Sequence, residues 1–286
     1  MAELEHTITA FGSELQALSR RIAEMGGLVE RQVLEAIEAL SKGDQERGRR
    51  VVAADTTIDH MQREIDEAVV TLIARRHPVA VDLRQAVAIL RIASELERIG
   101  DLAKNIGKRV GALERADLPR QFMGGVLHIA TLILAQLGNV LDSLANRDVA
   151  KAIEVWSRDQ DVDRLYTSLF RELLTHMVED PGTVTSAVHL VFCTKNIERI
   201  GDHATNIAEA IFYMVQGHVL WGERPKAFVT LNEGAAAAPE EIIAFCRERL
   251  AHYKCPDSIE FGPLPKTSTG KIQKFALREQ AKGLAG

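Results

Sequence analysis

Aromatic residues are scarce in this sequence, since Phe, Trp and Tyr together make up 5% of its 286 residues. The apolar content, 46% of the chain, comes mainly from Leu, Ile, Val and Ala, which suit packed helices better than a β-sandwich. Charged residues account for 26% of the chain. This composition is typical of a globular protein and excludes a wholly disordered chain.

Cysteine is also rare, and an excess of positive charge is absent. The three cysteines, Cys193, Cys246 and Cys255, are an odd number at wide spacing, which favours reduced thiols over a disulfide framework. Cys193 lies on an apolar stripe, so we expect a packed thiol and not a nucleophile. With 40 acidic and 35 basic residues, the net charge is −5, so the chain lacks the basic surface of a general nucleic-acid binder.

Long hydrophobic runs are missing as well. The first ten residues are charged and lack the apolar stretch of a secretory signal peptide. The longest apolar stretch, 126–137, contains polar residues and is shorter than the roughly 20 residues that span a bilayer. We therefore expect a cytoplasmic protein that reaches a membrane only through a partner.

Apolar residues recur at every third or fourth position over most of residues 1–218. This spacing is typical of amphipathic helices, and short polar or Pro-containing turns separate the helical segments. Such turns join antiparallel neighbours in a bundle. The predicted helices cover about 4–40, 44–76, 89–113, 126–144, 148–178 and 183–216.

The two groups of three helices share a motif. Residues 96–107 read LERIGDLAKNIG and residues 197–208 read IERIGDHATNIA, with eight of twelve positions identical at an offset of 101. A period near 100 residues is too long for a solenoid unit. The sequence therefore predicts an all-α fold of two repeated three-helix bundles, over 1–117 and 118–218.

Residues 219–286 have a different character. Short apolar runs at 227–231 and 258–261 predict two strands, and the segments from Pro239 to Leu250 and from Lys274 to Ala281 predict two short helices. We expect a small α/β segment after the bundles. Such a short segment can bury only a small core of its own.

The repeated motif carries paired acids. In a helix, Glu97 and Asp101 share one face, as do Glu198 and Asp202. The second helix of each bundle carries a matching pair that borders an apolar stripe. The first acidic group is Asp55, Asp59, Glu97 and Asp101, and the second acidic group is Asp159, Asp163, Glu198 and Asp202.

Each acidic group converges if the second and third helices of a bundle pack side by side. Like charges one helical turn apart repel each other, so such a group needs a cation. Oxygen ligands suit Mg²⁺, Mn²⁺, Ca²⁺ or iron better than a structural zinc. A solvated charged face is the alternative, and the repetition argues against it. Gly100 and Gly201, at equivalent mid-helix positions, indicate the close approach of a backbone or a ligand.

The duplicated LERIGD motif, the paired acids and the double bundle resemble the PhoU family, bacterial regulators of phosphate-specific transport, over about residues 1–218. The resemblance implies a cytoplasmic homodimer without an established enzymatic reaction. It implies contact with the ATP-binding subunit of the phosphate ABC transporter and with the phosphate sensor histidine kinase, restraining phosphate uptake and the phosphate regulon. It also implies that both acidic groups bind a divalent or trivalent metal ion, namely Mg, Mn, Fe or Zn.

Residues 221–286 resemble instead the C-terminal end of AMP-forming acyl-CoA synthetases. The similarity rests on WGERPKAFV at 221–229, EEIIAFCRERLAHYKCP at 240–256 and PKTSTGK at 265–271. In that family the last lysine of the third motif, here Lys271, enters the adenylation site. The ATP-binding domain is missing, so we expect no ligase activity from this chain alone. The alternatives to a regulator are a ligase fragment and a helical, metal-binding dimerisation scaffold.

Overall fold

The fold comes from a computed structural model. It describes residues 2–113, 119–218, 220, 226–232, 234, 236–249, 255–256, 258–266 and 272–282, without the side chains of 2–11, 159–161, 278, 279 and 282. The chain forms two compact units, residues 1–220 and 221–286.

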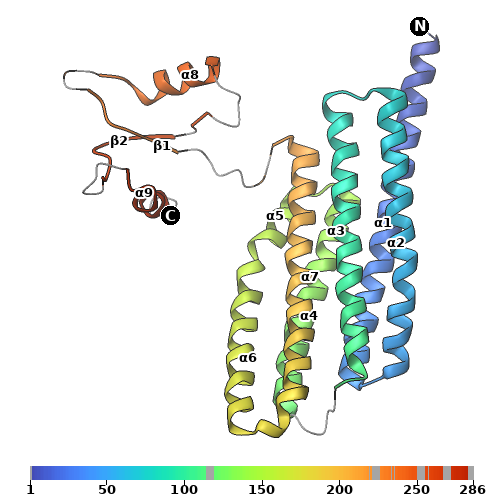
Figure 1. Cartoon of the computed structure of the whole chain (residues 1–286). Helices are drawn as coiled ribbons and strands as arrows, with labels where there is room; N and C mark the ends of the chain where they lie inside the picture. Colours follow the sequence, from blue (N-terminus) through green and yellow to red (C-terminus); the bar gives the residue numbers. More distant parts are fainter. Residues whose placement is uncertain are drawn as a thin grey trace. The chain divides into compact units, whose positions relative to one another are not determined.

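The first unit is a bundle of long antiparallel helices (Figure 1). Its first half contains α1 (Ala2–Lys42), α2 (Gln45–Arg76) and α3 (Ala80–Val110). Its second half contains α4 (Arg120–Asn146), α5 (Val149–Ser157), α6 (Asp159–Glu179), a 3-10 turn η2 (Pro181–Thr183) and α7 (Val184–Gln216). The predicted all-α fold of repeated helical groups is confirmed. Where one repeat ends and the next begins stays a prediction, because residues 114–118 lie outside the description.

The helix predicted over 148–178 is wrong in one respect, because it is divided into α5 and α6 at Arg158. The Arg158 amide bonds to the carbonyl of Val155, three residues back, instead of continuing the four-residue helical pattern. Such a bond tightens the last turn of α5, and α6 starts immediately afterwards. Asp159 therefore occupies the first position of α6, whereas Asp55 lies in the interior of α2. In addition, α4 begins at Arg120 and not at residue 126.

Matching aspartates start the second helix of each half. The Asp44 carboxylate accepts a hydrogen bond of 2.9 Å from the Arg47 amide, and the Asp148 carboxylate accepts one of 3.1 Å from the Lys151 amide. An N-cap aspartate satisfies a free backbone donor and complements the positive end of the helix dipole. The turn before Asp44 is made by Gly43, whose φ of 67° favours glycine.

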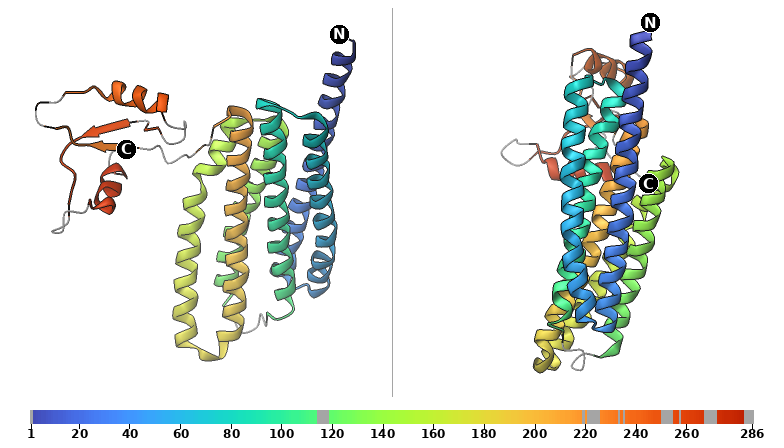
Figure 2. Two further views of the ribbon diagram at one scale, coloured as in Figure 1. Left: turned by 45° about the horizontal axis from the view of Figure 1, so that its top comes forward. Right: turned by 90° about the vertical axis from the view of Figure 1, so that its right-hand side faces the viewer.

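Helices α3 and α7 form the centre of the first unit. Helix α3 packs against α1, α2 and α7, and helix α7 packs against α3, α4, α5 and α6. Glu95 pairs with His203 and Arg109 with Phe192, so α3 and α7 run in opposite directions. The two copies of the repeated motif consequently lie side by side, as the views of Figure 2 also show for the two helices. The predicted core stripes, such as Ile92, are buried.

Among the described helices, α4 alone is long and apolar enough to cross a membrane by length and composition. Its apolar stretch is longer than the sequence indicated. The helix contacts α1, α5, α6 and α7, and it buries Val126, Ile133 and Val140. This packing buries 39% of its most apolar 18-residue window.

The second unit contains β1 (Lys226–Val229), α8 (Pro239–Arg249), β2 (Ser258–Phe261) and α9 (Lys274–Lys282), as predicted. The two strands are parallel and α8 connects them, which is a βαβ arrangement. Among the residues described in this unit, only Cys255 and Pro256 are buried. Phe245 and Phe275 are 57% and 70% exposed, so this unit has little core of its own.

Candidate functional site

The first acidic group lies between α2 and α3. Asp55 and Asp59 come from α2, and Glu97 and Asp101 come from α3. Burial and the negative charges of Asp101, Asp59 and Asp55 raise the pKa of the Glu97 carboxyl. The four carboxylates therefore lie near one another, as predicted, but among the described residues no three of them bring ligand atoms within 4.8 Å of one another.

A lysine lies inside this first acidic group. Lys104 Nζ is 2.5 Å from Asp55 Oδ2 and 2.7 Å from Asp101 Oδ1. Hydrogen bonds to Asp101 and Asp55 hold the pKa of Lys104 above its ordinary value, so the ammonium stays charged. Sequence reasoning missed this residue, although it belongs to the repeated motif. The only signal was its mismatch with Thr205 in the second copy.

The mid-helix glycines make room for side chains of the first helix in each half. A Cβ on Gly100 would lie 3.0 Å from Gln32 Oε1 of α1. A Cβ on Gly201 would lie 2.6 Å from Ile133 Cδ1 and 3.2 Å from Gln136 Oε1 of α4. The close approach inferred from these glycines exists, but side chains make it. The expected close approach of another backbone was wrong, and that of a ligand stays a prediction.

The second acidic group lies between α6 and α7. Asp163, Glu198 and Asp202 each place one carboxylate oxygen within 4.8 Å of the other two. Within the described part of the chain, this is the one set of three potential metal-binding side chains that approach so closely. The side chain of Asp159 lies outside the description. Three of the four predicted residues in this half are therefore brought together.

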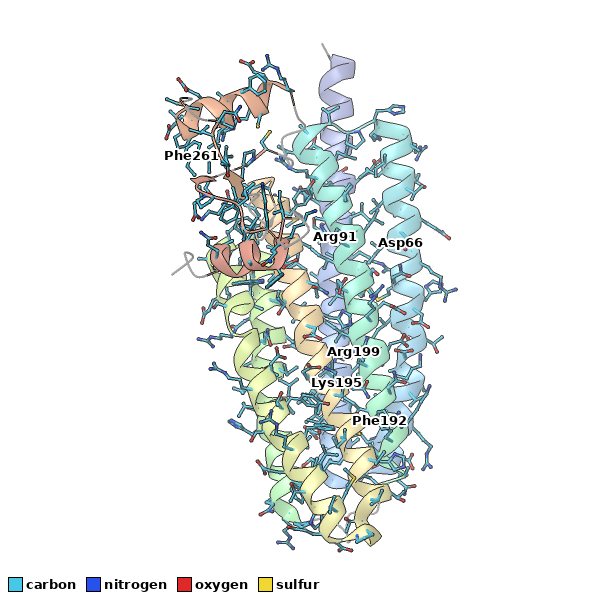
Figure 3. All side chains as sticks on the ribbon, turned by 60° about the vertical axis from the view of Figure 1, so that its left-hand side comes forward. Asp66, Arg91, Phe192, Lys195, Arg199 and Phe261 are labelled. Atoms are coloured by element: carbon cyan, nitrogen blue, oxygen red, sulfur yellow. The ribbon has the colours of Figure 1, made fainter. Side chains whose placement is uncertain are left out.

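Burial and mutual repulsion raise the pKa of two carboxyls in this second group. Glu198 is 7% exposed, and burial, Asp202 and Asp163 raise its pKa against the opposing effect of Lys195. Burial and Asp163 also raise the pKa of Asp202. Lys195 Nζ lies 2.6 Å from Glu198, but its side chain is 44% exposed on α7 (Figure 3). Three carboxylates beside one half-exposed lysine form a donor set that suits a hard cation.

A third polar cluster joins the two halves. Glu95 of α3 lies 2.6 Å from His203 Nδ1 and accepts a 3.0 Å hydrogen bond from Asn206, both on α7. Burial alone would raise the pKa of the Glu95 carboxyl. The hydrogen bonds outweigh burial and lower this pKa below its usual range. The sequence did not indicate this contact, because it depends on how α3 docks on α7. It fixes the junction between the halves.

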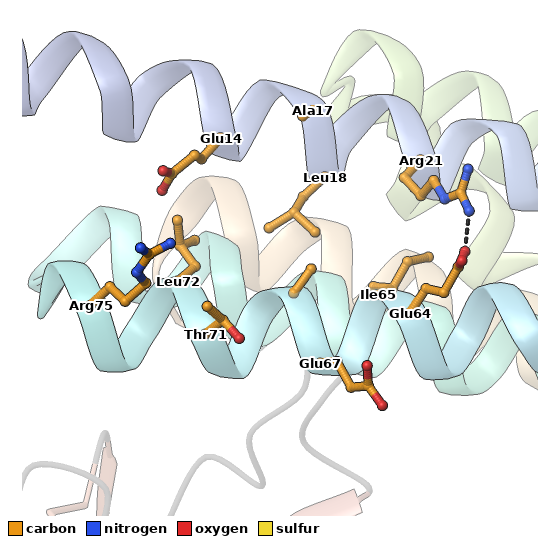
Figure 4. A pocket seen from close by; sticks show the side chains of 11 residues that line it. Glu14, Ala17, Leu18, Arg21, Glu64, Ile65, Glu67, Thr71, Leu72 and Arg75 are labelled. Atoms are coloured by element: carbon orange, nitrogen blue, oxygen red, sulfur yellow. Dashed lines mark hydrogen bonds and ion pairs between the residues drawn. The ribbon is translucent and has the colours of Figure 1, made fainter.

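A surface groove of about 630 Å³ lies apart from the acidic groups, between α1 and α2 (Figure 4). Leu18, Ile65 and Leu72 form its apolar lining, and the Arg21–Glu64 ion pair joins its two sides. None of the eight candidate metal ligands lines it. The groove therefore does not belong to the candidate metal sites.

Cys193 and Lys271 are the two remaining residues that the sequence analysis singled out. Cys193 is buried, and burial raises the pKa of its thiol to about 12, as expected of a packed cysteine. Lys271, the candidate adenylation lysine, lies outside the described residues.

The PhoU domain model matches residues 22–110 and again residues 126–211. The chain belongs to the PhoU family. It is 49% identical over 230 residues to the phosphate-specific transport system accessory protein PhoU homolog of Rhizobium meliloti, covering 80% of this chain and 97% of that protein. It is 37% identical over 214 residues to the Escherichia coli PhoU protein, covering 74% and 88% of the two chains. The resemblance found in the motifs is thereby confirmed.

Solved PhoU structures share the fold of the helical unit. The crystal structure of PhoU from Pseudomonas aeruginosa superposes with a TM-score of 0.70 at 38% identity, covering 73% of this chain and all (100%) of that one. PhoU from Streptococcus pneumoniae gives a TM-score of 0.68 at 26% identity, with 73% and 99% covered. A second family model, the AMP-binding enzyme C-terminal domain, matches residues 196–271, which include the last part of α7. This match confirms the predicted resemblance of the tail to that domain.

Proposed function

We propose that this protein regulates phosphate-specific transport. The observation that carries the proposal is the 49% identity to an accessory protein of that system over 97% of the relative's length. Both halves of the fold match the PhoU domain, and both copies of the motif lie on the central helices. A protein with this role restrains phosphate uptake and keeps the phosphate regulon off when phosphate is plentiful.

The proposed mode of action is protein contact in the cytoplasm. The partners are the ATP-binding subunit of the phosphate ABC transporter and the phosphate sensor histidine kinase, and the protein acts as a homodimer. The rigid pair α3 and α7, tied together by Glu95 and His203, holds the two halves in one orientation. Surfaces from both halves can then bind a partner together, and no covalent chemistry by this chain is needed.

A metal ion in the second acidic group forms part of the proposal. Asp163, Glu198 and Asp202 provide oxygen ligands for a divalent or trivalent ion, namely Mg, Mn, Fe or Zn. Asp159 stays the fourth ligand predicted from the sequence. Such an ion neutralises the carboxylates and ties α6 to α7. The buried, incompletely neutralised Glu198 supports this role. The first acidic group fits a metal less well, because Lys104 already lies among its carboxylates.

Pull-down assays test the regulatory role. Purified full-length protein is expected to bind the transporter's ATP-binding subunit and the cytoplasmic part of the sensor kinase. The Glu198→Gln/Asp202→Asn double variant is expected to bind less, because α6 and α7 lose their metal bridge. Glu179→Gln, at the end of α6, is the control. If neither partner is retained and gene deletion leaves phosphate uptake unchanged, the regulatory proposal is wrong.

The match to the AMP-binding enzyme C-terminal domain favours a second candidate. In that case the tail would supply Lys271 to an ATP-binding domain on a separate chain. ATP–pyrophosphate exchange with a carboxylic acid, measured alone and with candidate large domains, tests this. Absence of exchange in both settings removes the ligase candidate. A dimer that binds neither metal nor partner would remain as a scaffold.

A further inference from the structure

We propose that the ammonium group of Lys104 replaces a metal ion in the first acidic group, which confines metal binding in this chain to the second acidic group. The inference rests on the metal role proposed above and assigns that role to one half of the molecule. It follows from one difference between the two acidic groups, which the repeat otherwise makes equivalent: a lysine in the first and a threonine in the second.

Lys104 occupies the position that a bridging ion would take. Its Nζ contacts Asp55 on α2 and Asp101 on α3, at 2.5 and 2.7 Å, so one cation links the two helices. The lysine side chain is 25% exposed and the Asp55 side chain 3% exposed, so water competes little for this contact. The ammonium thus performs the bridging that a metal ion would otherwise provide.

The remaining oxygen of Asp55 is also engaged. Gln32 Nε2 donates to Asp55 Oδ1 at 3.4 Å and to the Val51 carbonyl at 3.1 Å. A metal ion bound to Asp55 would have to displace Lys104 or lie within a few ångströms of its positive charge. Both changes are unfavourable, since like charges repel strongly where water is excluded.

In the second half, a threonine takes the place of this lysine. The repeat places Thr205 where the first half has Lys104, and the buried Thr205 hydroxyl lies 3.3 Å from Gln136 Nε2. Lys195, the lysine nearest the second group, pairs with Glu198 and leaves about half of its side chain in solvent. A half-exposed lysine on one carboxylate can move away when a metal ion arrives, whereas a lysine held by two carboxylates cannot do so easily.

The consequence is a functional difference between the halves. The α2–α3 contact is held by a permanent charge, whatever the metal supply. The α6–α7 contact, which its apolar core already holds, gains an ionic bridge only when an ion is bound. Metal availability would therefore alter only the second half of the protein.

Mn²⁺ binding to the purified full-length protein tests the inference. Asp202→Asn and Asp101→Asn are a matched pair, because the two residues occupy equivalent positions of the repeat. We expect Asp202→Asn to weaken Mn²⁺ binding by about tenfold or more, and Asp101→Asn to leave it unchanged. Equal weakening by both substitutions, or a loss only with Asp101→Asn, would overturn the proposal.

Lys104→Thr provides the gain-of-binding arm. This variant copies the second half, so it is expected to bind additional Mn²⁺ and to show a thermal stability that rises when Mn²⁺ is added. Lys104→Gln, which removes the charge but keeps a polar side chain only one atom shorter than lysine, guards against a folding defect and is expected to behave in the same way. If both variants fold, as judged by helical circular dichroism, and neither binds more Mn²⁺ than the wild type, Lys104 is not the excluding residue.

The outcomes also separate this inference from the proposals on which it rests. If the wild type binds Mn²⁺ through both groups, the Lys104 inference fails and the metal role stands. If the wild type binds neither Mn²⁺ nor Mg²⁺, Fe³⁺ or Zn²⁺ in the same assay, the metal role fails together with the inference. Partner binding in the pull-down assay is a separate measurement and decides the regulatory role on its own.

Discussion

At the scale of single residues, the second acidic group stores electrostatic repulsion in the metal-free protein. Asp202 and Glu198 both have raised pKa values, caused first by burial and then by neighbouring carboxylates. An acid whose pKa is higher in the folded state binds its proton more tightly there than in the unfolded chain. As pH rises from the pKa of the unfolded state to that of the folded state, the acid therefore destabilises the fold. This destabilisation disappears when pH falls below the pKa of the unfolded state.

Asp202→Asn is thus expected to stabilise the metal-free protein at neutral pH. Removing one like-charge interaction is worth about 0.5 kcal/mol. The gain should shrink on acidification and vanish below about pH 4, where the unfolded carboxyl is protonated. Thermal unfolding in EDTA between pH 4 and 8 measures this. A variant that is less stable than the wild type at every pH would show that Asp202 is not destabilised by its neighbouring carboxylates.

Glu95 has the opposite electrostatic character. Its lowered pKa means that its contribution to stability is present at neutral pH and is lost as pH falls through the folded value. Glu95→Ala leaves His203, which is 8% exposed, without its partner at the junction of the halves. Leaving such a group unpaired costs about 1–3 kcal/mol. The midpoint of urea unfolding should fall accordingly.

Glu24→Ala is the control for this prediction. Glu24 makes an exposed ion pair with Arg21, 3.6 Å long, and such pairs contribute little. A urea midpoint that is lowered equally by Glu24→Ala and Glu95→Ala would show that Glu95 has no special role at the junction.

At the scale of helices, α2 and α3 approach each other most closely at two glycines. A Cβ on Gly48 would lie 2.8 Å from the Gly107 carbonyl oxygen, and one on Gly107 would lie 2.9 Å from that of Gly48. Both obstructions are backbone atoms, so no side-chain rotation relieves them. The equivalent positions of the second half carry Ala152 and Ala208. The two halves therefore differ in the residues at this helix contact, although their motifs match.

Gly48→Ala is consequently expected to lower stability. Forcing the helices apart costs about 1–3 kcal/mol, which exceeds the gain of at most about 1 kcal/mol from better helix propensity. The melting temperature should fall by a few degrees for a unit of this size. Gly27→Ala on α1 is the matched control, since no atom lies within 4 Å of its Cβ position, and it should be neutral or stabilising. A stabilised Gly48→Ala variant would contradict the close packing.

The helices were predictable because their apolar spacing and capping residues are local features of the sequence. The break at Arg158 was not, because neither proline nor glycine marks it and the tightened turn depends on packing. Half of the acids of the candidate sites could be found from the duplicated motif, and the other half from the matching four-residue spacing of aspartates in the preceding helix. The role of Lys104 could not, because it depends on the distance between a lysine on α3 and a carboxylate on α2. Contacts across helices are set by docking and leave no periodic signal.

At the scale of the whole molecule, the helical unit and the tail differ in how much core they have. The helical unit buries a continuous core that extends over both halves. In the tail, α8 has no buried residue, and Phe245, Ile272 and Phe275 are exposed. A βαβ unit with two strands leaves its sheet faces largely uncovered, and so small a core contributes little stability. The PhoU relatives correspond to the helical unit, which accordingly holds what the family shares.

Removal of residues 219–286 is therefore expected to leave the helical unit equally stable. Its melting temperature, followed by circular dichroism at 222 nm, should change by less than about 2 °C, the shift that a loss of roughly 1 kcal/mol would produce. Binding of the hydrophobic dye ANS should decrease, because the exposed phenylalanines of the tail are lost. A fall of several degrees would mean that the tail stabilises the bundle. In that case the AMP-binding-like segment would be a structural part of the regulator, and its removal should also weaken partner binding in the pull-down assay.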